Sequence, residues 1–258
     1  MDSLKCHRMI GGPVAGWQLP FCARMRKLPP MATEELYVSE SWRPALGRAG
    51  LDSLEALLGF EGGQTVGWHK RSQTFRLDLE GRTVFLKRDM LTLRKQILLD
   101  LLRLRPTLPM TYKERLAMVR AAGAGVRTAE IIAWGQARRR GLAHRGLLVT
   151  AELAGRPLDK LLGEAGGEAE RGRAMRAAGA AVGKLYAAGL SWPDLLPRHV
   201  HVVEGGDAGL LDLERLTVAS GGRLARDRAR QIERFIEECR KAGAGEDDLA
   251  ALREGLGL

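Results

Sequence analysis

Four charged residues have the types and the order along the chain that a phosphoryl-transfer site needs. Lys87 lies in a β-prone run and Glu114 on a predicted helix, whereas Asp194 and Asp212 flank a predicted hairpin. Phosphoryl transfer from ATP needs a cation on the α- and β-phosphates, an acid that orients this cation, a base for the acceptor hydroxyl, and carboxylates for Mg²⁺. The intervening hairpin would bring both aspartates to the same end of two adjacent strands. We therefore expect Asp194 and Asp212 to share one cleft.

The position of Lys87 depends on a β-hairpin. Residues 74–79 alternate between polar and apolar side chains, Glu80-Gly81 is a typical turn, and residues 83–88 resume the β-prone pattern. Because side chains alternate along a strand, Lys87 shares one face with Phe85.

The other predicted elements place most strands early and most helices late. Helices are expected over residues 52–59 (with Asp52 or Ser53 as the N-cap), 91–105, 111–122, 156–163, 168–188, 223–241 and 246–255. Further strands are expected over residues 129–134, 147–153, 199–203 and 210–213. Residues 60–74 are polar and contain several glycines. This order predicts an α+β fold of two lobes, because an alternating βαβ sheet would interleave the two kinds of element.

Composition limits the classes of partner and compartment. The 258 residues carry a net charge of +10, which favours anionic partners. Much of this excess lies in residues 1–30, which mix glycine, proline and basic residues, so a specific nucleic-acid partner is not required. We expect residues 1–30 to be a disordered leader, with Met31 as an alternative start. Three cysteines form neither a disulfide framework nor a zinc pattern, and no apolar run is long enough to span a membrane.

Several motifs resemble those of protein kinases. Val84-Phe85-Leu86-Lys87 resembles the strand-lysine motif, and the six residues from Asp194 to His199 resemble the catalytic loop. The segment Leu211–Arg215 resembles the metal-binding segment that follows this loop. With histidine at position 199 in place of asparagine, and with the pattern Asp-Leu-x-Arg, the chain is similar to the lipopolysaccharide core kinases, the WaaP/InaA heptose kinases and the related Kdo kinases. Two other stretches share this likeness: Lys113–Arg115 running into Ala121–Val126, and Gly135 followed by Arg138–Arg140 and the hinge Leu148–Leu153. The resemblance covers roughly residues 55–240.

The resemblance implies a protein-kinase-like fold with a small β-rich N-lobe over residues 31–152 and a shortened, mostly helical C-lobe over residues 153–258. It implies ATP and Mg²⁺ as cofactors. Lys87 would contact the phosphates and pair with Glu114, and Glu152 with its neighbours would form the hinge that holds adenine.

The same resemblance assigns the other roles. Asp194 would be the base that accepts the proton of a sugar hydroxyl, and Asp212 and His199 would hold Mg²⁺. Gly62 and Gly63, in the glycine-bearing stretch, would cover the phosphates. The acceptor would be an anionic glycan or glycolipid, specifically a heptose or Kdo hydroxyl of lipopolysaccharide core. The implied location is cytoplasmic, with peripheral contact to the inner membrane left open.

Departures from the kinase pattern keep alternatives open. Trp192-Pro193 stands where many kinases have His-Arg, and Glu214 replaces a glycine. A catalytically impaired pseudokinase scaffold and a small-molecule kinase of the aminoglycoside or choline type are therefore the competing hypotheses. Arg138–Arg140 is either a solvated turn or a dock for anionic lipid A or core phosphates, and His201 is expected to be structural.

Overall fold

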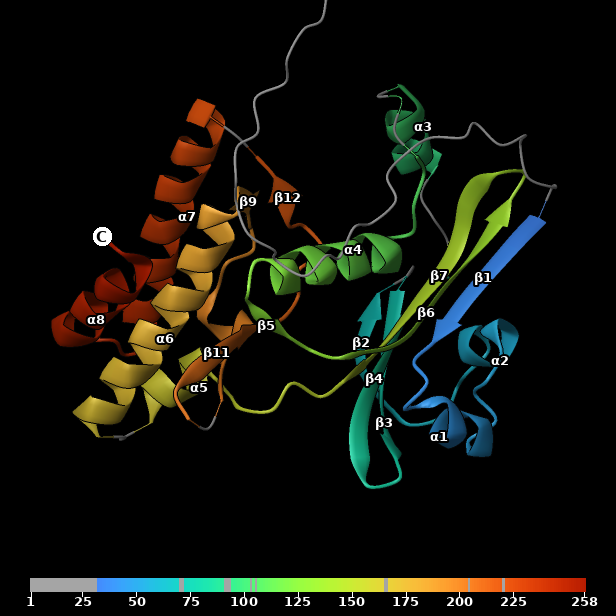
Figure 1. Ribbon diagram of the computed structural model, residues 1–258, viewed down its shortest axis with the longest axis horizontal. Helices are drawn as coiled ribbons and strands as arrows, with labels where there is room; N and C mark the ends of the chain where they lie inside the picture. The colour runs from blue at the N-terminus through green and yellow to red at the C-terminus, as the bar shows by residue number, and fades with distance from the viewer. Residues whose placement is uncertain are drawn as a thin grey trace, which may run out of the picture.

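The computed structural model describes residues 32–69, 72–90, 94–102, 104, 106–164, 167–203, 205–219 and 221–258. Two groups of elements lie side by side, a β-rich group from the first half of the chain and a mostly helical group from the second half (Figure 1). The predicted leader lies outside the described residues. In the described part of the chain, no helix combines the length and the apolar character needed to cross a membrane.

The first group is built on one six-stranded antiparallel sheet with the strand order β1-β6-β7-β4-β3-β2. Helices α1 and α2 contribute to the apolar core on one face of this sheet, and α4 packs on the other face (Figure 1). The elements are β1 (Ala32–Val38), α1 (Arg43–Arg48), α2 (Leu54–Leu58), β2 (Gln64–His69), β3 (Ser72–Leu79), β4 (Arg82–Asp89), α3 (Arg94–Leu102), α4 (Met110–Gly123), β5 (Arg127–Thr128), β6 (Ile131–Arg139) and β7 (Leu142–Ala151).

Local chemistry explains the hairpin that carries Lys87. Glu80 and Gly81 both have positive φ, 57° and 76°, as the tight turns between antiparallel strands require. The Asp78 carboxylate accepts a hydrogen bond from the Gly81 backbone N–H at 2.8 Å, which fixes this turn. Thr74 and Leu148 consequently flank Lys87 on the neighbouring strands.

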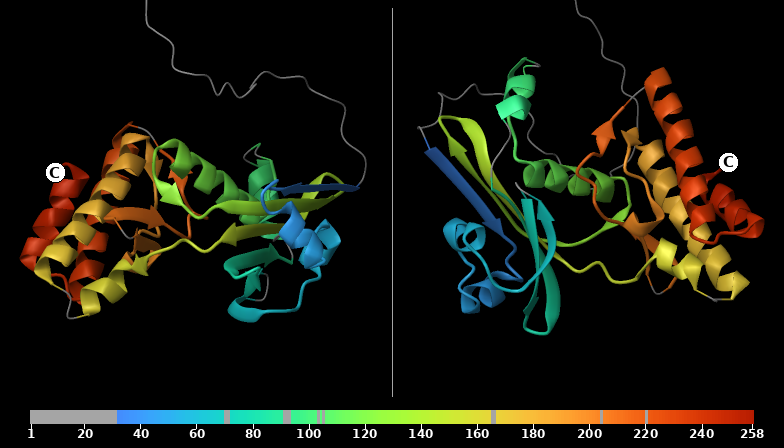
Figure 2. Two further views of the ribbon diagram at one scale, coloured as in Figure 1. Left: turned by 60° about the horizontal axis from the view of Figure 1, so that its bottom comes forward. Right: turned by 180° about the vertical axis from the view of Figure 1, so that it is seen from behind.

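The second group packs helices around a small sheet in which β10 and β11 form an antiparallel hairpin. Its two long helices, α6 and α7, lie near the short strands β9 and β12 (Figure 2). The elements are β8 (Arg156–Pro157), α5 (Leu158–Gly163), α6 (Glu168–Ala187), β9 (Leu190–Ser191), the 3-10 turn η1 (Pro197–His199), β10 (Val200–Val203), β11 (Asp207–Leu210), β12 (Thr217–Val218), α7 (Gly221–Lys241) and α8 (Glu246–Leu256).

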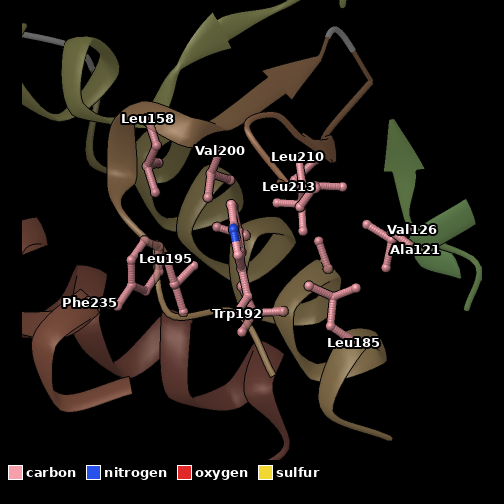
Figure 3. Close-up of a cluster of buried hydrophobic side chains, with 14 of the residues drawn as sticks. Ala121, Val126, Leu158, Leu185, Trp192, Leu195, Val200, Leu210, Leu213 and Phe235 are labelled. Atoms are coloured by element: carbon pink, nitrogen blue, oxygen red, sulfur yellow. The ribbon is translucent and has the colours of Figure 1, made fainter. Parts of the chain in front are cut away.

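The larger apolar core lies in this second group. Trp192 is fully buried at its centre, between side chains that include Leu185, Leu195 and Phe235 (Figure 3). Side chains of α4 such as Ala121 also belong to this cluster, so the first group of elements shares a core with the second. The predicted lobe boundary at residue 152 stays a prediction.

Several sequence-based boundaries differ from the structure. The strands β1 and β2 and the helix α1 were not predicted, because each gains its stability from pairing or packing with distant segments. The strand β2 occupies part of the stretch expected to be a polar loop, and it pairs with β3 across a bulge near Gly67. The predicted helix over residues 91–105 is confirmed as a helix only over Arg94–Leu102. The strand β11 ends at Leu210, so Asp212 follows the strand rather than lying in it.

Candidate active site

The predicted lysine–glutamate pair is present in the structure. Lys87 Nζ lies 2.7 Å from Glu114 Oε2, and it also lies 3.1 Å from Glu214 Oε2. Glu114 comes from α4 and Glu214 from the loop after β11, so this single ammonium group joins the sheet to both the helix and the second group of elements. The Glu214 contact was not expected from the sequence.

The end of β4 positions the helix that carries Glu114. The buried Asp89 carboxylate accepts a hydrogen bond at 2.7 Å from the Thr111 backbone N–H, in the first turn of α4. On β7, a Cβ atom at Gly146 would lie 2.6 Å from the Pro109 side chain, so glycine allows the close approach of α4 to the sheet. Lys87 and Asp89, which holds the first turn of the helix that carries Glu114, thus lie two residues apart on β4.

The charges in this cluster do not balance. Burial by itself lowers the pKa of Lys87, but attraction to Glu114 and Glu214 outweighs it, so the pKa of Lys87 is raised and the ammonium stays charged. Burial also raises the pKa of Glu114; Lys87 opposes this rise, and repulsion from Glu214 and Asp212 adds to it. Two carboxylates therefore compete for one partly buried cation.

The candidate site has two walls: the sheet side with Lys87 and Glu114, and the loop side, which carries the predicted base and metal ligands. His199 Nε2 lies 3.6 Å from Asp212 Oδ2, and His199 Nδ1 lies 2.8 Å from the backbone oxygen of Asp194. Arg215 donates a hydrogen bond at 2.8 Å to the Asp194 carboxylate. The structure therefore brings Asp194, His199 and Asp212 together, as the sequence predicted.

The two walls meet through the short segment after β11. Asp212 has a positive φ of 56°, a backbone conformation that is uncommon for a residue other than glycine. Glu214, two residues later, contacts Lys87, and the next residue contacts Asp194. Three charged residues within four positions thus connect Lys87 to Asp194.

Buried groups fix the loop on which Asp194 lies. The Trp192 indole donates to the backbone oxygen of Asp212 at 3.2 Å, and its ring fills the core (Figure 3). Gln231 of α7 accepts hydrogen bonds at 3.0 Å from both the Trp192 backbone N–H and the Tyr186 hydroxyl, and it donates to the Ser191 hydroxyl at 2.8 Å. The Trp192-Pro193 pair therefore has a structural role, and it leaves Asp194 at the cleft.

A cavity of about 420 Å³ lies where the resemblance places adenine. Phe85, Thr150 and Glu152 line it from the sheet, and Leu211 and His201 line it from the second group of elements. The Nδ1 atom of His201 is buried without a hydrogen-bond partner among the described residues, which fits a site that receives a polar ring. The backbone N–H of Glu152 is bonded to the Thr83 oxygen at 3.0 Å.

The donor set also fits a metal ion that arrives with a nucleotide. Within the described ranges, no group of three or more histidine, cysteine or acidic side chains is placed to hold a metal ion by itself. Mg²⁺ at phosphoryl-transfer sites is commonly held by one or two carboxylates together with phosphate oxygens and water. The Asp212 carboxylate, 46% exposed, is open to such an ion.

The two predicted glycines do not lie at a hairpin turn. Gly63 comes just before β2, and a Cβ atom there would lie 2.7 Å from the Arg76 backbone oxygen. Gly67, not Gly62 or Gly63, pairs with Thr74 and so lies level with Lys87 across the sheet. Residues 70 and 71, between β2 and β3, lie outside the described ranges.

Sequence reasoning missed three residues that the structure places at the site: Glu214, Arg215 and Gln231. The first two stood inside a recognised motif, but only the folded chain shows which charges they meet. Gln231 carries no sequence signal beyond being a polar residue on the apolar side of a predicted amphipathic helix.

The structure thus joins a lysine–glutamate pair on a sheet and helix to two aspartates, Asp194 before η1 and Asp212 after β11. This arrangement is typical of a protein-kinase-like phosphotransferase. The model of the lipopolysaccharide kinase (Kdo/WaaP) family matches residues 61–255. Because this match spans most of the chain, the chain belongs to that family and is a kinase. The assignment confirms the predicted resemblance, and a kinase of this family implies the use of ATP.

The fold is confirmed by a solved structure. The structure described as WaaP in complex with acyl carrier protein is similar with a TM-score of 0.62 and 22% sequence identity, over 86% of this chain and 88% of that chain. A crystal structure of WbdD is similar with a TM-score of 0.46 and 17% identity, over 77% of this chain and 46% of that chain. No curated protein sequence matches the chain.

Proposed function

We propose that the chain transfers the γ-phosphoryl group of ATP, with Mg²⁺, to a sugar hydroxyl of lipopolysaccharide core, a heptose or Kdo, or to a similar glycan. The observation that carries this proposal is that the segment Asp212–Arg215 contacts both the Lys87–Glu114 pair, through Glu214, and the Asp194 carboxylate, through Arg215. This arrangement supplies a fixed cation for the phosphates on one side and carboxylates for the acceptor and the metal on the other.

Each residue acts through its position. Lys87, held charged by Glu114, would orient the α- and β-phosphates, and Asp212 with His199 would hold the metal ion, which neutralises phosphate charge. Asp194 would accept the proton of the attacking hydroxyl, because its backbone contacts His199 and its carboxylate contacts Arg215, three residues after Asp212. Such a site works by positioning and by electrostatic stabilisation, as phosphoryl transfer requires.

The direct test is phosphate transfer from labelled ATP to the oligosaccharide of deacylated lipopolysaccharide. We expect wild-type turnover that requires Mg²⁺, and loss of turnover in Asp194→Asn while the variant still binds Mg·ATP. Absence of transfer by the wild type, or full transfer by Asp194→Asn, would contradict the proposal.

The second candidate is a pseudokinase scaffold, and the Glu214 contact to Lys87 is the observation in its favour. A carboxylate on the phosphate-binding cation opposes nucleotide binding. Thermal unfolding separates the two candidates, because a ligand at about 100 times its Kd stabilises a protein by about 2.7 kcal/mol. An unchanged melting temperature at millimolar Mg·ATP would support the scaffold and exclude the kinase proposal.

We also propose peripheral contact with the inner membrane, since the acceptor is a glycolipid. Three leucines of α3 and one that follows it are exposed in the described part of the chain: Leu98, Leu101, Leu102 and Leu104. Sedimentation with anionic vesicles tests this contact, and we expect Leu98→Gln/Leu102→Gln to reduce the bound fraction. Equal binding by the wild type and this variant would refute a role for α3.

A further inference from the structure

A stripe of arginines follows the solvent side of α7. Arg226, Arg230 and Arg234 are exposed and recur at four-residue intervals, so they lie on one face of the helix. Among the described residues, none of the three has a carboxylate within ion-pair distance. By contrast, Arg223 and Arg240 on the same helix are paired with Asp227 and Glu246.

One end of this stripe reaches the catalytic loop. Arg234 donates a hydrogen bond at 3.4 Å to the backbone oxygen of Pro193, the residue before Asp194. The neighbouring Phe235 is fully buried in the same core as Leu195 of the loop (Figure 3). The helix is therefore fixed beside the loop, and its arginines keep their position relative to Asp194.

Two further arginines extend the positive charge around the base. Arg198 is exposed and donates to His199 Nε2 at 3.1 Å, and Arg215, 60% exposed, contacts Asp194. Glu238 lies near both Arg198 and Arg234, and it forms an ion pair with Lys241. Several guanidinium groups thus lie beside the loop that carries Asp194.

The physical cost of this arrangement argues for a ligand. Like charges four residues apart on a helix repel each other, and none of the three arginines forms an ion pair with a described residue, so their mutual repulsion slightly destabilises α7. Guanidinium groups bind phosphate and carboxylate groups in a planar, bidentate manner. The stripe is about 12 Å long at 1.5 Å per residue, which suits an oligosaccharide with several anionic groups better than a monosaccharide with one.

We propose that the α7 arginine stripe (Arg226, Arg230 and Arg234) is an acceptor-binding site for a glycan that carries phosphate or carboxylate groups. The stripe holds these groups while the target hydroxyl reaches Asp194. This inference rests on the proposed function, since it assigns the substrate class of that same active site. It also disfavours a cationic acceptor such as an aminoglycoside or choline.

The structure supplies a matched control. The sequence offered Arg138–Arg140 as a dock for anionic groups, and these residues lie at the turn between β6 and β7. Arg138 pairs with Ala143, which lies five residues along β7 from Leu148, the partner of Lys87, or about 17 Å at 3.3 Å per residue. Arg139 and Arg140 lie farther along. Replacing these three arginines removes the same charge as replacing the stripe, but away from the active site.

The test compares Arg226→Gln/Arg230→Gln/Arg234→Gln with Arg138→Gln/Arg139→Gln/Arg140→Gln. Glutamine keeps high helix propensity and removes only the charge. The probe is the deacylated lipopolysaccharide oligosaccharide with its phosphates and Kdo carboxylates, titrated by calorimetry into the full chain with saturating non-hydrolysable Mg·nucleotide. A second probe is the same oligosaccharide after dephosphorylation and carboxyl reduction.

We expect the stripe variant to bind the anionic probe at least about tenfold more weakly than the wild type, and the control variant to change its affinity less than about twofold. All three proteins should bind the neutral probe equally weakly, and the nucleotide affinity should not change. Equal loss in both variants, or wild-type affinity in the stripe variant, would overturn the inference. If the binding results hold but the wild type transfers no phosphate to the probe, the proposed function fails and the anion site stands.

Discussion

The two walls of the candidate site differ in how exposed their charged side chains are. On the sheet side, Lys87 and Glu114 have side chains that are 23% and 12% exposed, and they are held by strand pairing and by the capped start of α4. On the loop side, the Asp212 and Arg215 side chains are 46% and 60% exposed. Lys87 is thus held by buried partners, whereas Asp212 and Arg215, in the segment after β11, remain open to solvent. Asp194 and His199 on the same side are 23% and 13% exposed, so the openness is confined to that segment.

This difference shows what fixes the positions of the charged side chains on each side of the site. Buried charges interact strongly, so the position of Lys87 follows from its two carboxylate partners. The exposed charges of the loop interact weakly through water, so their positions depend on the buried support beneath them. Trp192 and Gln231 supply this support.

The largest effect should come from Asp194, the proposed base on the loop side. Replacement of Asp194 by asparagine removes the proton acceptor and keeps the shape, so kcat should fall by about 10²- to 10⁴-fold. Turnover with the lipopolysaccharide oligosaccharide measures this fall, and an unchanged thermal shift with Mg·ATP shows that the other wall is intact. If nucleotide binding is lost as well, the two walls are not independent.

The next largest effect should come from Gln231, the buried residue that holds the loop of Asp194. Replacement of Gln231 by leucine leaves the Trp192 N–H and the hydroxyls of Tyr186 and Ser191 without this partner. We expect a loss of about 3 kcal/mol in unfolding free energy and a fall of about 6–12 °C in melting temperature. Glu233→Leu, at an exposed position on the same helix, is the control and should change stability by less than about 0.5 kcal/mol. Equal stability of the two variants would show that Gln231 does not support the loop.

The two carboxylates on Lys87 should have opposite effects on nucleotide binding. Glu114→Gln leaves the lysine poorly oriented, so the affinity for Mg·ATP should fall about tenfold, or 1.4 kcal/mol. Glu214→Gln removes a competitor of the phosphates, so the affinity should rise a few-fold. Calorimetric titration measures both changes. Weaker binding in Glu214→Gln would instead place Glu214 with the metal ion.

The smallest effect should be a dependence of the free energy of unfolding on pH, caused by His201 in the cavity. Burial is the main cause that lowers the pKa of His201, although nearby acids oppose it. The unfolded chain therefore binds a proton more readily, and the stability that neutral His201 contributes is lost as the pH falls below about 6.5. Urea unfolding at pH 7.5 and 5.5 should show a smaller loss on acidification in His201→Gln than in the wild type. An identical loss in both proteins would show that His201 does not cause the pH dependence of stability.

Much of the fold was accessible from the sequence because it is encoded locally. Alternation around Glu80-Gly81 predicted the hairpin of Lys87, and Ser53 and Gly59 predicted both ends of α2. The strand β2 was not accessible, because its polar residues and Gly67 form a strand only through pairing with β3. Residues of the site were accessible where a motif fixes type and spacing, as for Asp194 and His199.

The sequence by itself determined the types of the reacting groups and the order in which they occur, because these depend on residue chemistry and short spacings. Only the tertiary structure decided that Glu214 shares Lys87 with Glu114, that Gln231 supports the loop of Asp194, and that the α7 arginines lie beside it. The hydrogen bonds behind these relations join residues that are between 27 and 127 positions apart. Contacts at such separations follow from how the whole core packs, and no local pattern encodes them.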